Sequence, residues 1–155
     1  MSKRLAYKDY RQQIVLCLLL ISPGALVVIF SESSWGDFRF ERDAISNGDW
    51  WRLVTGHFDH LGWNHWSLNA LFLAVCIWIF SPLHTVMKTL LIWLIASVCI
   101  SLCMLYFSPT LQWYVGLSSS LYALLLYGIL LEEKFPWFIR LRAIVTGKQI
   151  GRAHV

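Results

Sequence analysis

Four long apolar stretches separated by polar segments dominate the hydrophobic pattern of this sequence. A helix needs roughly 20 residues to cross about 30 Å of hydrocarbon, and runs near this length occur at residues 12–30, 61–80, 89–107 and 110–131. The acidic residues all lie outside these runs and the basic residues gather at their ends, as expected because an unpaired charge in lipid costs several kcal/mol. The pattern predicts an all-α, polytopic membrane helix bundle with four complete transmembrane helices.

The charged residues predict how these helices are oriented. The first run follows the basic residues Lys3, Arg4, Lys8 and Arg11, which predicts a cytoplasmic N-terminus because positive residues are enriched in cytoplasmic loops. The acidic segment at residues 31–59 then lies outside, and the basic segments around Lys88 and at residues 134–142 lie inside. A secretory signal peptide would start in the same way, but three further apolar runs follow here.

Composition narrows the class further. With 57% apolar and 14% charged residues, the chain is too apolar for an ordinary soluble domain of this length. The net charge of +4 does not indicate nucleic acid, since the basic residues form no stripe with interleaved aromatic residues. Tryptophans gather instead at the predicted outer boundary of the membrane, where such rings prefer to lie: Trp50, Trp51, Trp63, Trp66 and Trp113.

Cysteines and histidines give no sign of a metal or cofactor. The cysteines lie in apolar runs, where a thiol behaves as a small apolar group, so we expect neither a disulfide nor a metal site from them. His57, His60 and His65 lack the HExxH pattern of membrane metalloproteases, and we expect His57 and His60 to be solvated or interfacial. No apolar run contains an aspartate, which excludes an intramembrane aspartyl protease.

The polar side chains inside the runs carry the information on function, because each needs a partner or a water-filled cavity. The second run opens with the sequence HLGWNHWSLN at residues 60–69. His65 and Asn69 are four residues apart and project from one face of a helix. Two interpretations are open at this point: a functional pair, or two polar groups that hydrogen-bond across a helix interface.

The fourth run contains Gly116 and the serine cluster at residues 118–120. A serine at a helix start is commonly a cap, and small residues in membrane helices are commonly packing contacts. A serine nucleophile in the same place would have free backbone N–H groups and the positive end of the helix dipole beside it. Those groups stabilise an oxyanion, so a catalytic interpretation stands beside the structural one.

Together the two elements resemble the rhomboid family of intramembrane serine proteases. That family carries an HxxxN motif on its second span and a GxSx motif on its fourth. His65 and Asn69 fill the first motif, and Gly116 and Ser118 fill the second. A departure follows at Ser119, where the family usually has glycine.

Rhomboids also carry a Trp-Arg pair in the first outer loop, matched here by Trp51 and Arg52. These two residues either brace the loop or anchor it at the interface with a snorkelling cation. Within the family, residues 48–57 (GDWWRLVTGH) and 114–118 (YVGLS) look most like the rhombosortase branch. The resemblance runs from about residue 38 to residue 149.

The resemblance implies a mechanism and a set of roles. Ser118 would attack the peptide carbonyl, while its own N–H, His65 and the Asn69 amide hold the developing oxyanion. Tyr122, one helical turn below Ser118, would pack against the catalytic histidine, which belongs on a sixth span. Rhomboids use a Ser-His dyad, so an orienting acid is not needed.

A sixth span is missing from this sequence. A fifth span begins near Phe138 and does not finish, since residues 146–155 are too polar and too few to cross a bilayer. Residues 150–155 match one reading frame of a widely used sequencing-library adapter. We therefore expect residues 1–149 to be an incomplete rhomboid-like membrane domain and residues 150–155 to be a non-native tail, which an uninterrupted genomic frame ending at Val155 would contradict.

This hypothesis has two consequences for activity. His154 is not the catalytic histidine, because it belongs to the non-native tail. The chain as written is expected to be inactive, because loss of a catalytic base costs on the order of 10⁴ to 10⁶ in turnover.

The resemblance also implies substrates and a location. The substrates would be membrane proteins cut near the outer face, with a C-terminal tail that has a glycine-rich motif, one apolar span and a basic cluster, in a bacterial inner membrane. Two other functions stay open. One is a rhomboid-like pseudoprotease that binds transmembrane helices without cutting them, and the other is a transporter or assembly subunit whose polar groups are helix-packing contacts.

Overall fold

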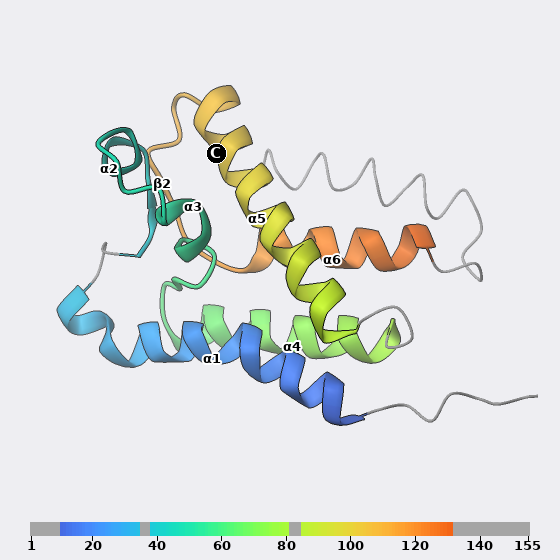
Figure 1. Cartoon of the computed structure of the whole chain (residues 1–155). Helices are drawn as coiled ribbons and strands as arrows, with labels where there is room; N and C mark the ends of the chain where they lie inside the picture. Colours follow the sequence, from blue (N-terminus) through green and yellow to red (C-terminus); the bar gives the residue numbers. More distant parts are fainter. Residues whose placement is uncertain (1–9, 35–37, 81–84, 132–155) are drawn as a thin grey trace, which may run out of the picture.

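The computed structural model describes residues 10–34, 38–80 and 85–131 (Figure 1). Its elements in chain order are α1 (Tyr10–Ser34), β1 (Phe40–Glu41), α2 (Arg42–Ser46), α3 (Arg52–Thr55), α4 (Trp63–Ile79), α5 (Val86–Phe107), β2 (Trp113–Tyr114) and α6 (Ser118–Leu131). The predicted helix bundle is confirmed for this part of the chain, and a two-stranded ribbon that the hydrophobic pattern did not predict accompanies it.

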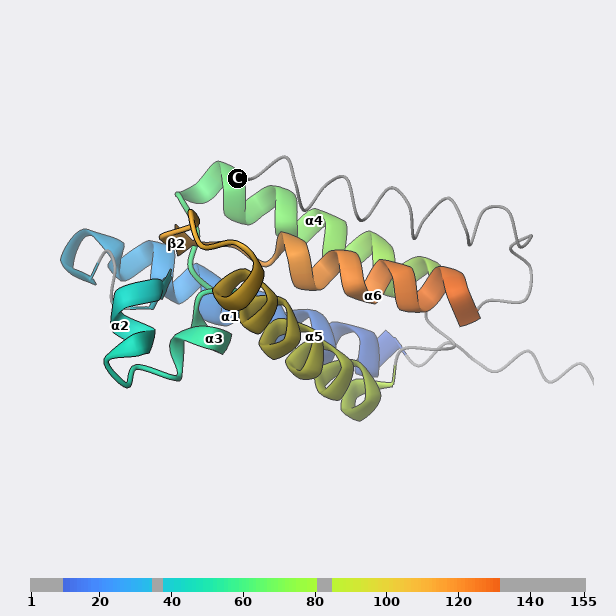
Figure 2. The ribbon, with the colours of Figure 1, turned by 90° about the horizontal axis from the view of Figure 1, so that it is seen from above.

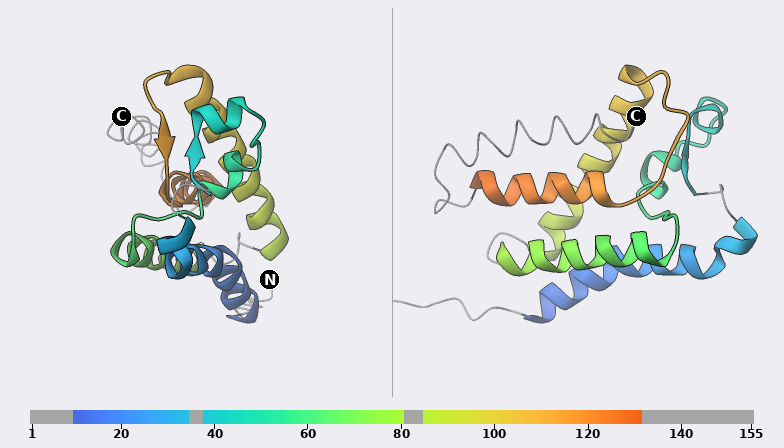
Figure 3. Two further views of the ribbon diagram at one scale, coloured as in Figure 1. Left: turned by 90° about the vertical axis from the view of Figure 1, so that its left-hand side faces the viewer. Right: turned by 180° about the vertical axis from the view of Figure 1, so that it is seen from behind.

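The four long helices run back and forth. In Figures 1 and 2, α1 and α4 lie side by side, α6 lies along α4, and α5 crosses the others obliquely. The C-terminal ends of α1 and α5 and the N-terminal ends of α4 and α6 point toward the same end of the bundle, where α2, α3 and the ribbon gather (Figures 1 and 3). Both predicted motifs therefore begin at the end that the charge pattern assigns to the outer side.

The helices overlap all four predicted spans but do not all reach spanning length. By length and composition, Arg11–Phe30 within α1 and Val86–Phe107 are candidate membrane spans. The helix α4 has 17 residues and α6 has 14. The structure thus confirms an apolar helix in each predicted run, and a length sufficient for crossing in two of them.

The predicted fourth helix at residues 110–131 is wrong over its first part, because the helix begins only at Ser118. Trp113 and Tyr114 form β2, which pairs antiparallel with β1 through Phe40 opposite Tyr114. Gly116 then has a φ of 119°, a conformation that side-chain-bearing residues rarely adopt. Hydropathy did not reveal this, since tryptophan and tyrosine count as apolar in a helix and in a strand alike.

One face of α5 carries three small hydroxyl residues and one tryptophan into the bundle. Thr89, Trp93, Ser97 and Ser101 recur every four residues and are all buried, as expected for one helical face. Small hydroxyl residues let membrane helices approach closely and bond to each other. The Trp93 indole N–H donates to Ser120 Oγ at 3.0 Å, which ties α5 to α6.

Apolar side chains form two clusters and also cover the outside. The larger cluster lies among α1, α4, α5 and α6 and includes Leu16, Leu73 and Leu121. The smaller cluster joins β2 to residues 38–59, which we name the outer loop after its predicted side of the membrane: Phe40, Ile45, Leu53 and Tyr114. Many other large apolar side chains are exposed along α1, α4 and α5, which suits contact with lipid rather than water.

The predicted fifth span near Phe138, the predicted tail at residues 150–155 and His154 all lie outside the described residues.

Candidate active site

The candidate nucleophile stands at the start of a helix, after a turn that requires glycine. Ser118 is the first residue of α6, and the Gly116 N–H donates to the carbonyl of Gly56 at 3.0 Å. A Cβ at position 116 would lie 2.7 Å from Cε1 of His65. Glycine is therefore needed here for its positive φ and for the close approach of the His65 ring.

A cavity of about 640 Å³ opens beside this turn, a size in the usual range for sites that bind small ligands. His65 near the start of α4 and Ser118 at the start of α6 both line it, and Leu61 and residues 110–115 form the rest of its wall. Two of the predicted site residues, far apart in the sequence, therefore meet at one cavity.

The ring of His65 lies against the turn that precedes Ser118. The backbone N–H of Leu61 points to Nδ1 of His65 at 3.5 Å, which is a long contact. A Cβ at position 116 would be 3.0 Å from Nε2 of the same ring, so this nitrogen lies beside the turn.

Asn69 has different surroundings. It is buried, and its amide donates to the carbonyl of His65 at 3.1 Å within the same helix. It lines a separate small void with His60, Trp66 and Leu117, and it is not among the residues that line the cavity at Ser118. The structure thus brings His65 and Ser118 together but does not bring the Asn69 amide into their cavity.

Two tyrosines flank Ser118. The hydroxyl of Tyr114, on β2, lies 3.2 Å from Ser118 Oγ and donates to the Gly116 carbonyl at 2.9 Å. Sequence reasoning missed Tyr114 as a site residue, because only the strand pairing turns it back toward α6. Tyr122 lies one turn after Ser118 in α6, and the sixth-span histidine that it is predicted to touch lies outside the described residues.

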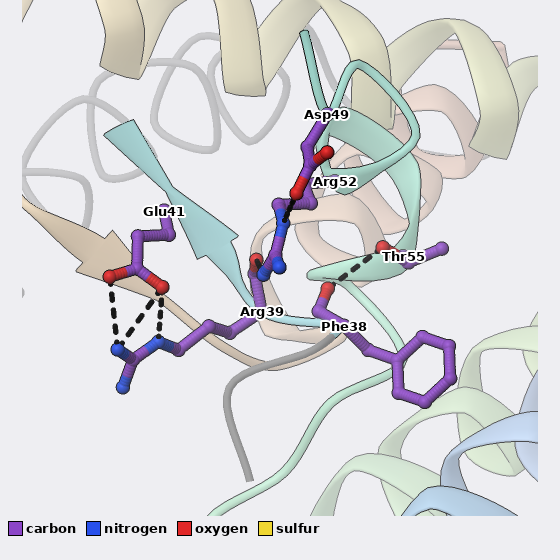
Figure 4. Close-up of polar contacts among 6 residues, drawn as sticks. All are labelled: Phe38, Arg39, Glu41, Asp49, Arg52 and Thr55. Carbon is purple, nitrogen blue, oxygen red and sulfur yellow. Dashed lines mark hydrogen bonds and ion pairs between the residues drawn. The ribbon is translucent and has the colours of Figure 1, made fainter. Parts of the chain in front are cut away.

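The arginine of the Trp-Arg pair is buried in the outer loop (Figure 4). Arg52 Nε donates to Asp49 Oδ2 at 2.9 Å, and its Nη1 donates to the Arg39 carbonyl at 3.2 Å. Thr55 Oγ1 donates to the Phe38 carbonyl at 2.8 Å. The bonds to Arg39 and Phe38 fasten α3 to the segment before β1, which fits the loop-bracing interpretation of Arg52.

The tryptophan of that pair fits the other interpretation. Trp51 is exposed, as are Trp50, Trp63 and Trp113. Exposed indole rings near the outer end of a membrane bundle suit an interfacial position.

His57 and His60 are buried, so the expectation that they are solvated is wrong, and the alternative expectation that they are interfacial stays a prediction. They are only 1% and 4% exposed. Burial lowers the pKa of each ring to about 4, although nearby backbone carbonyls favour the charged form. Both rings are therefore neutral at pH 7. Within the described ranges, no group of three or more His, Cys, Asp or Glu side chains could hold a metal ion.

Comparison with known protein families gives a match. A model of the Rhomboid domain matches residues 47–145, well over half of the chain. The matched range contains every residue of the predicted site: Trp51, Arg52, His65, Asn69, Gly116, Ser118 and Tyr122. Comparisons with curated proteins and with solved structures gave no match.

Proposed function

The chain belongs to the rhomboid family, and we propose that it is an intramembrane serine endopeptidase with Ser118 as its nucleophile. Members of this family are in general serine proteases that act on membrane-protein substrates. The observation that supports the proposal is that Ser118, at a helix N-terminus, and His65, whose Nε2 lies beside the turn before Ser118, line one cavity.

In the proposed reaction, Ser118 Oγ attacks the carbonyl carbon of the scissile peptide bond, and its proton passes to a base. The carbonyl oxygen becomes an oxyanion, to which the Ser118 N–H and the His65 Nε2–H donate. The C–N bond then breaks, the amine leaves with the proton, and water hydrolyses the acyl-enzyme. By resemblance the base is a histidine on a later span, against which Tyr122 packs, and it lies outside the described residues.

Asn69 joins this site only after a rotation of its side chain. Its amide donates to the His65 carbonyl in the resting arrangement, which supports the turn that presents His65. We propose that the amide turns to the oxyanion once substrate fills the cavity. Asn69 then contributes a second side-chain donor in the transition state, and its removal lowers kcat more than it raises KM.

The finer assignment is to the rhombosortase branch, supported by residues 48–57 and 114–118. Substrates of that type are exported proteins with a glycine-rich motif, one apolar span and a basic cluster at the C-terminus. Cleavage takes place near the outer face of a bacterial inner membrane, with the N-terminus of the enzyme in the cytoplasm. The exposed Trp50 and Trp51 lie between α1 and α4, and Trp113 lies with residues 110–115 of the cavity wall between α5 and α6. These two segments meet at one end of the bundle (Figure 1), which suits this position.

Labelling with a fluorophosphonate probe tests the nucleophile. The protein is expressed from its genomic reading frame and purified into lipid nanodiscs, and labelling is compared between the wild type, Ser118→Ala and Ser67→Ala. Ser67 is an exposed serine on α4 whose hydroxyl bonds only within its own helix turn among the described residues, so it is the matched control. We expect labelling of the wild type and of Ser67→Ala, and none of Ser118→Ala.

Equal labelling of wild type and Ser118→Ala would remove Ser118 as the nucleophile. A second assay follows the cleavage of a single-span substrate carrying the predicted tail. If the wild type binds this substrate but neither cleaves it nor takes up the probe, the non-catalytic alternative, a pseudoprotease that binds transmembrane helices, replaces the proposal.

A further inference from the structure

A run of hydrogen-bonding side chains leads from Ser118 to the buried His57. The Tyr114 hydroxyl lies 3.2 Å from Ser118 Oγ and 3.0 Å from Ser119 Oγ. Ser119 Oγ in turn lies 3.4 Å from Nδ1 of His57. The Tyr114 and His57 rings also lie close together, with centroids 5.8 Å apart and planes tilted by 60°. These side chains come from β2, from α6 and from the turn after α3.

The surroundings of His57 hold its ring in place at the far end. Its Nε2 lies 3.1 Å from the carbonyl of Ser97 and 3.2 Å from Ser101 Oγ. Ser101 already donates its hydrogen to the Leu53 carbonyl at 2.7 Å, so both neighbours of Nε2 are acceptors, which favours the proton of the neutral ring on Nε2. The Gly116 carbonyl is a further backbone acceptor at this ring, and Ser119 Oγ is the side-chain neighbour of Nδ1.

Tyr114 connects this end to Ser118. Its hydroxyl hydrogen has two nearby acceptors, Ser119 Oγ at 3.0 Å and the Gly116 carbonyl at 2.9 Å. Its oxygen also accepts the backbone N–H of Ser119 at 3.4 Å, and either hydroxyl can be the donor in its contact with Ser118. The Ser118 hydroxyl thus lies against a tyrosine that is itself fixed by three further polar contacts.

We propose that Tyr114 and Ser119 are positioning residues that hold the Ser118 hydroxyl in one rotamer, with His57 as the fixed end of the run. The proposal rests on the proposed function of Ser118 as nucleophile. The rhomboid family usually has glycine at the position of Ser119. The Ser119 hydroxyl therefore makes a contact that a glycine could not make. Holding the nucleophile before attack lowers the entropy cost of reaching the reactive geometry, so the effect falls on kcat rather than on KM.

His57 itself is not assigned the role of base. Burial lowers its pKa to about 4, which makes it a weak proton acceptor at neutral pH, whereas an effective general base has a pKa near the working pH. Its place beneath Ser119, with 1% of its surface exposed, suits a fixed anchor for the hydroxyl groups.

Histidine NMR tests the run of hydrogen bonds without requiring activity. The protein expressed from its genomic reading frame is labelled with ¹⁵N-histidine in nanodiscs, and the His57 signals are assigned by their loss in His57→Gln. We expect the neutral Nε2–H form, with an Nδ1 signal that moves in Ser119→Ala and returns toward its wild-type position in Ser119→Thr, which restores a hydroxyl. An Nδ1 signal that does not respond to Ser119→Ala overturns the inference.

Kinetics test whether the run positions the nucleophile. Tyr114→Phe and Ser119→Ala are each expected to lower kcat by about tenfold with KM within twofold, the effect of one ordinary hydrogen bond. Tyr106→Phe removes a hydroxyl from an exposed tyrosine on α5 and is expected to keep the wild-type rate, and Ser119→Thr is expected to recover part of it. A wild-type kcat in Tyr114→Phe overturns the positioning role. Wild-type protein that takes up no fluorophosphonate refutes the proposed function instead, and the NMR result still decides whether the run exists.

Discussion

Replacement of Arg42 by alanine should loosen the junction between the outer loop and α5. The last carbonyls of a helix have no partner within the helix. The guanidinium of Arg42 fills this place by donating to four carbonyls, those of Met104 (2.9 Å), Leu105 (2.6 Å), Ser108 (2.7 Å) and Leu111 (3.1 Å). Its backbone N–H donates to the Gln112 carbonyl at 2.9 Å. Arg42 therefore holds the end of α5 and residues 108–112, part of which forms the cavity wall.

The size of the effect follows from these contacts. A hydrogen bond to a charged group contributes about 1.5–3 kcal/mol, and a cation at a helix C-terminus adds about 0.3–1 kcal/mol. The four bonds share one guanidinium that is only partly buried, and water can replace some of them, so they do not add. We expect Arg42→Ala to lower the free energy of unfolding by about 2–4 kcal/mol, which is roughly 4–16 °C in Tm at about 2–4 °C per kcal/mol.

Arg39→Ala is the matched control, because it removes the same side chain three residues earlier. Arg39 pairs with Glu41 at 3.1 Å, and about one third of each side chain is exposed. Exposed ion pairs contribute at most about 1 kcal/mol. Arg42→Lys should fall between the two, since an ammonium keeps the charge but lacks the planar set of donors.

Thermal unfolding of the purified variants in one detergent, followed by circular dichroism, measures these differences. If Arg42→Ala costs no more than Arg39→Ala, the capping of α5 by Arg42 contributes nothing beyond a surface charge, and the reasoning is refuted. A second readout is cleavage of the single-span substrate. It should fall in Arg42→Ala at temperatures where that variant is still folded.

Three further predictions concern the turn at Ser118 and the buried histidines. Gly116→Ala should reduce fluorophosphonate labelling strongly even where the protein folds, because a Cβ there lies 2.7 Å from the His65 ring; labelling at the wild-type rate would contradict this. Gly56→Ala should lower Tm more than Gly48→Ala, because a Cβ at position 56 would lie 2.5 Å from the Phe40 backbone nitrogen while a Cβ at position 48 would have no neighbour within 4 Å. Gly48→Ala carries only the backbone strain of its φ of 113°. Equal Tm shifts in the two variants would contradict a cost of the close contact at Gly56. Acid should destabilise the fold, because burial lowers the pKa of His57 to about 4, so below about pH 6.5 the unfolded chain binds a proton that the folded chain does not. The loss should grow to about 3 kcal/mol near pH 4, and Tm measured from pH 7 to 4 should fall less steeply in His57→Gln.

The helices and the two motif positions could be predicted from the sequence because each rests on local information. Apolar runs define α1 and α5, and the i, i+4 spacing of His65 and Asn69 fixes their common helical side. The same spacing cannot tell whether the Asn69 amide points into a cavity or back to the His65 carbonyl, since both are open to a short polar side chain on a helix. The structure has the second arrangement.

The remaining features depend on contacts between distant parts of the chain. The apolar pattern of residues 110–117 predicts the start of a helix, but pairing of Trp113 and Tyr114 with β1 makes part of this segment a strand. The local sequence predicts that His57 is a solvated loop residue, but in the structure its Nε2 contacts Ser97 and Ser101 of α5. No local pattern contains the partner in either case, so hydropathy and spacing could not have given the answer.

The outer loop holds the candidate active site in place. Arg42 joins it to the end of α5, Arg52 and Thr55 fasten α3 to the segment before β1, and Gly56 accepts the hydrogen bond of Gly116. The last of these bonds lies two residues before Ser118, so the position of the proposed nucleophile depends on a loop that contributes none of the proposed reacting groups. Substitutions in residues 38–57 should therefore lower kcat without changing the identity of the nucleophile, and the loss should follow the hydrogen bonds that are broken rather than the distance from Ser118.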